Sequence, residues 1–258
     1  MATMAWSLDA LIFPTHAVAP ADPLPPGAER LSLDASGGVK LYGVHIPPAD
    51  GSTGPRTLVI GFGGNAWNGE NVASFLHQLY PEADVVAFHY RGYRPSTGRP
   101  SADALVEDAP LALDLAIERV KPERVVAVGF SIGSGVAASL ARSGALDGLI
   151  LVTPFDSLKS VARDLYPWVP GLTFAFRHEL DAAGFLKGTQ VPTAIIAAER
   201  DEIVPASRTE ALRRQVPNLV FDRTIGGAGH NDIYARSDFH QAMREALETV
   251  LARATKGS

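Results

Sequence analysis

Short apolar runs recur along the chain from residue 57 onward, and a segment of helical periodicity follows most of them. Each run has the length and the β-branched residues of a strand that is buried on both faces. We predict such strands at 57–60, 85–88, 125–128, 149–152 and 194–197, and a further strand at 219–222. We predict helices at 72–80, 102–120, 132–142, 206–215 and 238–253. This alternation predicts an α/β fold with a mostly parallel central sheet and helices on both of its faces.

The residues before position 57 follow a different pattern. Segments 30–34 and 40–46 alternate apolar and polar residues, which is typical of half-exposed strands. Gly37 and Gly38 lie between them, so we predict a hairpin. The proline-rich stretch 14–27 before the hairpin indicates an extended arm.

The composition fits one large globular domain. The chain has 258 residues, of which 46% are hydrophobic and 20% are charged, and this length suffices to bury a sizeable core. We assign 1–35 to an N-terminal arm and first strand, and 36–258 to the main domain, with a small cap insertion at about 155–190. The absence of cysteine excludes thiol catalysis, and a net charge of -5 gives no electrostatic case for a nucleic-acid partner. We expect a cytoplasmic protein with no integral membrane segment, because the apolar patch 10–13 is too short to span a bilayer. The composition indicates no particular oligomeric state.

A serine flanked by glycines stands at the boundary between a predicted strand and a predicted helix. The motif is Gly129-Phe130-Ser131-Ile132-Gly133. A serine on such a tight strand-to-helix turn takes a strained backbone, and glycines two residues either side remove the Cβ atoms that would clash. The same turn puts the Ile132 N–H at a helix N-terminus, where it favours a developing oxyanion. We therefore predict a nucleophile elbow, against the alternative of an ordinary surface serine in a glycine-rich corner.

Five further stretches stand beside the serine motif in a characteristic order. They are Phe62-Gly63-Gly64-Asn65-Ala66, Tyr90-Arg91-Gly92-Tyr93, Thr153-Pro154-Phe155-Asp156-Ser157-Leu158, Asp201-Glu202-Ile203-Val204-Pro205 and Gly227-Ala228-Gly229-His230-Asn231-Asp232. Together the sequence resembles the α/β-hydrolase superfamily, in particular a lid-poor branch of serine hydrolases whose first catalytic loop has the sequence His-Gly-Asn-Ala. The resemblance covers about residues 36 to 250. It implies the α/β-hydrolase fold and a small-molecule ester or thioester substrate.

A serine hydroxyl needs a base to take its proton, and in this fold the histidine follows the serine in the chain. His178, His230 and His240 meet that condition. His230 follows the predicted strand 219–222 and the glycine loop 226–229, and it matches the family's Gly-His-Asn position. His178 falls in the cap insertion and His240 inside the last helix, where a packed or solvated role is more usual. We therefore predict His230 as the base.

The third member is a carboxylate that fixes the tautomer of the base. Asp201 follows the strand 194–197 and matches the family's acid loop, whereas Asp156 follows the preceding strand, where some hydrolases keep their acid. We favour Asp201 on the motif match. Glu199, Glu202 and Asp232 are neighbours that fit ordinary surface charges.

The loop after the first parallel strand carries the second oxyanion donor by resemblance. The resemblance assigns that donor N–H to Asn65, alongside Ile132. The family's histidine in this loop is Gly63 here, which puts a supporting hydrogen bond in doubt. The stretch 61–66 also satisfies the G-x-G-x-x-A pattern of a dinucleotide site, but 88–91 lacks the acid that would bind a ribose hydroxyl. The sequence contains none of the common metal or nucleotide motifs, so we predict neither a cofactor nor a metal.

Bulky side chains near these loops are candidates for the substrate pocket, although packing against the sheet is the commoner role for such residues. The candidates are Trp67, Tyr166, Trp168 and Phe174. We predict a serine hydrolase of carboxylic esters or thioesters that works through an acyl-enzyme. The alternatives are a serine peptidase of the same fold and a non-catalytic relative that kept a ligand pocket.

Overall fold

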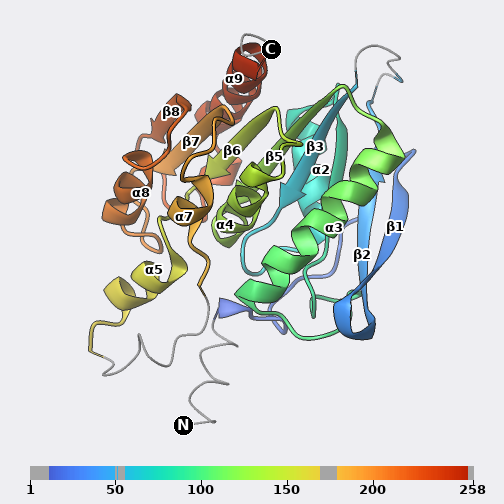
Figure 1. Cartoon of the computed structure of the whole chain (residues 1–258), viewed down its shortest axis with the longest axis horizontal. Coiled ribbons are helices and arrows are strands. Elements are labelled where there is room, and N and C mark those ends of the chain that lie inside the picture. The colour runs from blue at the N-terminus through green and yellow to red at the C-terminus, as the bar shows by residue number, and fades with distance from the viewer. Residues whose placement is uncertain (1–11, 50, 52–55, 169–178, 255–258) are drawn as a thin grey trace. The chain divides into compact units, whose positions relative to one another are not determined.

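The computed structural model describes residues 12–49, 51, 56–168 and 179–254. The chain folds into two compact units, residues 1–125 and 126–258. The described residues contain eight strands, and the strands and helices are labelled in Figure 1.

The first unit is built on four strands in the order β1-β2-β4-β3. They are β1 (Glu29–Ala35), β2 (Val39–Ile46), β3 (Thr57–Phe62) and β4 (Asp84–Phe88). β1 pairs antiparallel with β2, β2 pairs antiparallel with β4, and β3 pairs parallel with β4. Gly37 and Gly38 connect β1 to β2 with φ of 72° each, a conformation that glycine adopts without strain. The predicted hairpin is therefore present.

Two helices pack on the strands of the first unit. Asn68 caps α2 (Gly69–Leu79), and its side chain accepts the Asn71 N–H at 2.8 Å. Ser101 caps α3 (Ala102–Val120), and its hydroxyl accepts the Ala104 N–H at 3.1 Å. Each cap satisfies one backbone donor that the helix itself leaves unpaired. Figure 1 shows α3 in front of the strands of this unit and α2 behind them.

The second unit is built on four parallel strands. They are β5 (Arg124–Phe130), β6 (Gly148–Val152), β7 (Thr193–Ala198) and β8 (Leu219–Ile225). β5 pairs with β6, β6 with β7, and β7 with β8, and β5 starts two residues before the unit boundary. β6 and β7 are buried along their whole length, as their continuous apolar runs predict. Parallel strands share one carboxyl edge, so the loops after β5, β7 and β8 meet there.

The described part of the second unit has helices at the three predicted positions, α4 (Ile132–Ser139), α8 (Ala206–Arg213) and α9 (Ser237–Ala254). It has two more that the sequence pattern did not predict, α5 (Leu158–Leu165) and α7 (Ala182–Leu186). α4 contacts β6 and α7, and α9 packs on β6, β7 and β8. The predicted helix 132–142 is α-helical only to Ser139 and continues as a 3-10 turn, Leu140–Arg142. α5 and α7 lie within the segment predicted as the cap insertion.

Candidate active site

Ser131 occupies the turn between β5 and α4 in a strained conformation. Its backbone has φ of 51° and ψ of -117°, in the half of conformational space that only glycine visits freely. A Cβ placed on Gly129 would lie 2.2 Å from the Gly133 carbonyl oxygen, so only glycine fits there. The Ser131 N–H donates to the Val152 carbonyl of β6 at 2.9 Å, which ties the turn to the sheet. The turn therefore holds Ser131 rigidly at the carboxyl edge of the strands.

Ser131, His230 and Asp201 form a hydrogen-bonded chain within the second unit. His230 Nε2 lies 3.0 Å from Ser131 Oγ. His230 Nδ1 lies 2.9 Å from Oδ1 and 2.8 Å from Oδ2 of Asp201. Because a carboxylate offers only acceptors, Nδ1 carries the proton and Nε2 is left to accept the serine hydroxyl. The side chains of His230 and Asp201 are each 6% exposed, so water competes little for these bonds.

Backbone groups fix the orientation of the Asp201 carboxylate. Its Oδ1 accepts the N–H of Ile203 at 2.9 Å and the N–H of Val204 at 2.7 Å. These bonds close a turn in which the Asp201 side chain accepts two backbone N–H groups of the loop that carries it. The carboxylate therefore cannot rotate away from His230 without breaking both of them.

The alternatives that the sequence offered for the acid and the base lie apart from this chain of hydrogen bonds. The Asp156 carboxylate accepts a hydrogen bond from Arg208 Nη1 at 3.2 Å, and it makes an ion pair rather than a contact with a histidine. His240 lies in α9, and its Nε2 is 2.7 Å from the Tyr234 carbonyl oxygen. His178 lies outside the described residues.

Three carboxylates hold the loop that carries His230. Glu199 accepts the Gly227 N–H at 2.7 Å. Asp232 accepts the Gly229 N–H at 2.8 Å, and Glu202 accepts the N–H of His230 itself at 3.1 Å. The sequence indicated only ordinary surface charges at these three positions. Glu202 and Asp232 stand in the same sequence motifs as Asp201 and His230, and this was the signal that the sequence offered. Which backbone N–H each carboxylate accepts depends on the folded loop.

The two predicted oxyanion donors lie in different units, Asn65 in the first and Ile132 in the second. Ile132 is the first residue of α4 and is 3% exposed. Its N–H lies in the first turn of the helix, so no carbonyl of α4 can accept it. Asn65 lies in the loop between β3 and α2, and no described residue accepts its N–H. At the position of the family's histidine, a Cβ on Gly63 would lie 2.8 Å from Val72 Cγ2. A side chain at this position would therefore force Val72 or the loop to shift.

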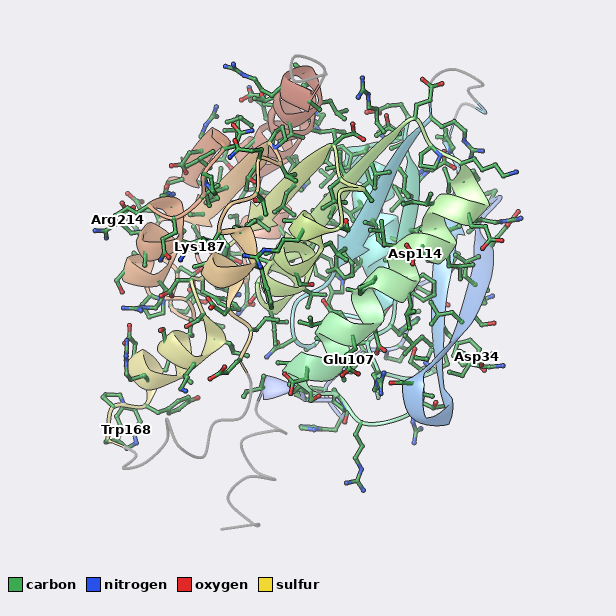
Figure 2. The ribbon with its side chains drawn as sticks, in the orientation of Figure 1. Asp34, Glu107, Asp114, Trp168, Lys187 and Arg214 are labelled. Atoms are coloured by element: carbon green, nitrogen blue, oxygen red, sulfur yellow. The ribbon has the colours of Figure 1, made fainter. Side chains whose placement is uncertain are left out.

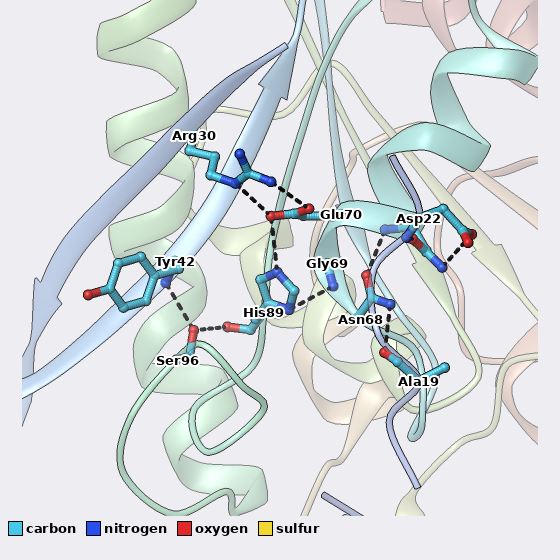
Figure 3. A network of polar contacts seen from close by, with 10 residues as sticks. Ala19, Asp22, Arg30, Tyr42, Asn68, Gly69, Glu70, His89 and Ser96 are labelled. Atoms are coloured by element: carbon cyan, nitrogen blue, oxygen red, sulfur yellow. Dashed lines mark hydrogen bonds and ion pairs between the residues drawn. The ribbon is translucent and has the colours of Figure 1, made fainter. Parts of the chain in front are cut away.

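A buried polar network anchors the start of α2, directly after the Asn65 loop (Figure 3). The Gly69 N–H donates to His89 Nδ1 at 3.3 Å, and Glu70 pairs with Arg30 at 3.2 Å. Burial lowers the pKa of His89, and the nearby Glu70 carboxylate opposes this shift. The Asn68 amide also donates to the Ala19 carbonyl at 3.1 Å, which ties the N-terminal arm to the helix start.

The four candidate pocket residues differ in their surroundings. Trp67 packs on Phe75 with ring centroids 5.4 Å apart. Tyr166 and Trp168 meet edge to face at 5.9 Å, and Trp168 is 71% exposed and points outward from the chain (Figure 2). Phe174 lies outside the described residues.

In the part of the chain that the structure describes, no helix combines the length and the apolar character needed to cross a bilayer. Within the same residues, no three His, Asp or Glu side chains are grouped so that they could hold a metal ion.

Comparisons with known proteins place the chain in a family. Residues 58–185 match the model of the alpha/beta hydrolase fold family. An uncharacterized protein of Mycobacterium tuberculosis is 31% identical over 89% of this chain and 83% of its own length. A lysophosphatidylserine lipase of Xenopus tropicalis is 28% identical over 63% of this chain and 49% of its own. The structure of an esterase from Pyrococcus furiosus superposes with a TM-score of 0.70 at 18% identity, covering 92% of this chain and 96% of that one.

The chain therefore belongs to the α/β-hydrolase fold superfamily. The fold class predicted from the sequence is confirmed by the family match and the structural likeness.

Proposed function

We propose that the protein is a serine hydrolase that cleaves carboxylic ester or thioester bonds through an acyl-enzyme intermediate. Ser131 is the nucleophile, His230 is the general base and then the general acid, and Asp201 orients and stabilises the imidazole. The observation that carries the proposal is the continuous hydrogen-bond path from Ser131 Oγ through His230 to Asp201. That geometry matches the one required to activate a serine hydroxyl near neutral pH.

The first half of the reaction forms the acyl-enzyme. His230 Nε2 takes the hydroxyl proton while Ser131 Oγ bonds to the carbonyl carbon and the carbonyl oxygen becomes an oxyanion. The resemblance assigns the N–H groups of Ile132 and Asn65 as the donors to that oxygen, which is stabilised most in the transition state. The intermediate then collapses. The bond to the leaving alcohol or thiol breaks, and His230 gives its proton to that group.

The second half releases the acid. A water molecule gives a proton to His230 and attacks the acyl carbon, and collapse of the new tetrahedral intermediate returns the proton to Ser131 Oγ. The relatives named as a lipase and an esterase support an ester as the substrate class. A peptide substrate needs the same residues, so substrate choice is the property that separates an esterase from a peptidase here.

Removal of the nucleophile tests the proposal. Ser131→Ala should abolish hydrolysis of nitrophenyl butyrate, with a loss on the order of 10⁶ in kcat, and should abolish labelling by a fluorophosphonate probe. Ser139→Ala is the matched control, since Ser139 lies at the end of the same helix and its hydroxyl donates only to the Val136 carbonyl. Turnover that survives in purified Ser131→Ala protein would refute the role of Ser131. Faster cleavage of peptide nitroanilides than of esters would move the protein to the peptidases.

A further inference from the structure

Three consecutive carbonyl groups in the loop after β3 are each held by a hydrogen bond. The Tyr90 hydroxyl donates to the Gly63 carbonyl at 2.8 Å. The Trp67 N–H donates to the Gly64 carbonyl at 3.2 Å. The Tyr93 hydroxyl donates to the Asn65 carbonyl. Two of the three donors are thus tyrosine side chains from the segment that follows β4.

These bonds bear directly on the direction of the Asn65 N–H. That N–H belongs to the peptide unit between Gly64 and Asn65, and the tyrosines hold the peptide units on either side of it. Each peptide unit is planar, so fixing the carbonyl of a unit also fixes its N–H. Without those restraints, Gly63 and Gly64 would allow the loop many conformations, because glycine visits both halves of the backbone map.

The segment that carries the tyrosines is itself rigidly tied to the strands. Ser96 donates to the His89 carbonyl at 2.9 Å and accepts the Tyr42 N–H of β2 at 2.9 Å (Figure 3). The Tyr93 N–H donates to the Tyr90 carbonyl at 2.8 Å, which sets the spacing of the two rings. The rings also meet edge to face, with centroids 5.7 Å apart. Through His89 the same segment also holds Gly69, at the far end of the loop.

Both hydroxyls remain donors over the working range of pH. Burial raises the pKa of Tyr93 and of Tyr90 well above the value of an exposed tyrosine. Tyr93 is fully buried, so its hydroxyl has no water to replace the Asn65 carbonyl as a partner. A buried hydroxyl of this kind is costly to leave unpaired, which favours the observed conformation of the loop.

We propose that Tyr90 and Tyr93 are positioning residues for the oxyanion hole, acting through the backbone of Gly63 and Asn65 rather than on the substrate. The inference rests on the proposed function, in which the Asn65 N–H stabilises the oxyanion. It assigns a role to two residues of the Tyr90-Arg91-Gly92-Tyr93 stretch, which the sequence had marked only as a point of resemblance.

The test removes one hydroxyl at a time. Tyr93→Phe and Tyr90→Phe keep the rings and lose the donors. Tyr42→Phe is the matched control, because the Tyr42 hydroxyl lies away from the network in Figure 3. Each variant is assayed for thermal unfolding, for kcat and KM on nitrophenyl butyrate, and for inhibition by butylboronic acid. The boron of that inhibitor accepts the Ser131 oxygen and becomes a tetrahedral anion that mimics the oxyanion intermediate.

Tyr93→Phe should lower kcat by about tenfold to 10²-fold with KM within about twofold, since a loosened donor costs less than the roughly 10²–10³ of a deleted one. Inhibition by the boronate should weaken by the same factor as kcat/KM. Tyr90→Phe should show a smaller loss, and it decides the question if Tyr93→Phe does not fold. Wild-type kcat and boronate affinity in the folded variants, with or without a lower Tm, would overturn this inference and leave the proposed function standing. A wild-type protein that neither hydrolyses the ester nor reacts with the fluorophosphonate would overturn both.

Discussion

Asp201→Asn is the most informative single change to the candidate triad, because the structure determines how the new amide would sit. Oδ1 of Asp201 accepts the N–H groups of Ile203 and Val204 at 2.9 and 2.7 Å. The asparagine oxygen keeps these bonds only if it takes the Oδ1 position. Its NH₂ group then stands in the Oδ2 position, which is 2.8 Å from His230 Nδ1. The NH₂ group meets a proton on Nδ1 donor to donor, whereas only the oxygen at the Oδ1 position, 2.9 Å from Nδ1, can still accept it. The substitution therefore favours the imidazole tautomer with its proton on Nε2.

The size of the effect follows from that arrangement. With the proton on Nε2, His230 can no longer accept the Ser131 proton, so turnover depends mainly on the form in which the amide is flipped. The flipped amide loses two backbone hydrogen bonds at about 1 to 1.5 kcal/mol each, which makes the productive form roughly 10²-fold rarer. Loss of the carboxylate charge also destabilises the imidazolium that forms in the transition state. Together we expect a loss on the order of 10⁴ in kcat, as in other serine triads.

The assay compares Asp201→Asn with Asp156→Asn. Asp156 pairs with Arg208 in the same unit, so the second variant makes the same chemical change away from His230. We measure kcat on nitrophenyl butyrate and the Tm of each protein. Asp201→Asn should keep its Tm, since the oxygen still closes the turn at Ile203 and Val204. A loss below tenfold in folded Asp201→Asn, or a large loss in Asp156→Asn instead, would refute the assignment of the acid.

Two further predictions concern the His230 loop and the acyl group. Glu202→Ala should lower kcat about threefold to tenfold, because the His230 N–H loses a partner worth about 1 kcal/mol. Glu202→Gln should recover most of the lost kcat, because it keeps an acceptor oxygen. Equal kcat in the wild type and both variants would show that the His230 loop does not need this hydrogen bond. The cap insertion spans only about 155–190 and carries bulky residues such as Tyr166, so we predict that kcat/KM rises about fourfold per methylene, or about 0.8 kcal/mol, only until a short to medium acyl chain fills the pocket. A rise that continues from butyrate to palmitate esters, measured below their micelle thresholds, would contradict it.

The fold could be predicted from the sequence because its signals are local. The strand runs at 149–152 and 194–197 lie within β6 and β7, and the helix predicted at 102–120 coincides with α3. Continuous apolar runs of β-branched residues have few alternatives to a buried parallel strand. Element ends were less well predicted. α2 starts at Gly69 rather than near residue 72, because the Asn68 side chain caps it, and a cap depends on geometry as well as residue type.

The site was predictable only in part. Ser131 is marked by its two glycines, whose need is visible in the backbone contact at Gly129. The side chains of Tyr90, Tyr93 and Glu202 bind backbone groups. Almost every residue type has the same backbone carbonyl and amide, so the sequence does not reveal these partners. Sequence patterns therefore identify the groups proposed to react more readily than the groups that hold them in place.

At Gly63 the loop after β3 is held by a hydrogen bond from another segment of the chain. The family's histidine is absent there, and the 2.8 Å approach of Val72 Cγ2 to a Cβ at that position leaves no room for one. The Gly63 carbonyl is instead bound by Tyr90 from outside the loop. A loop of glycines is flexible in isolation, so its order here comes from neighbours that are themselves tied to β2 and to His89, the residue after β4. Mutations in the tyrosine segment should therefore affect turnover more than their distance along the chain from Ser131 suggests.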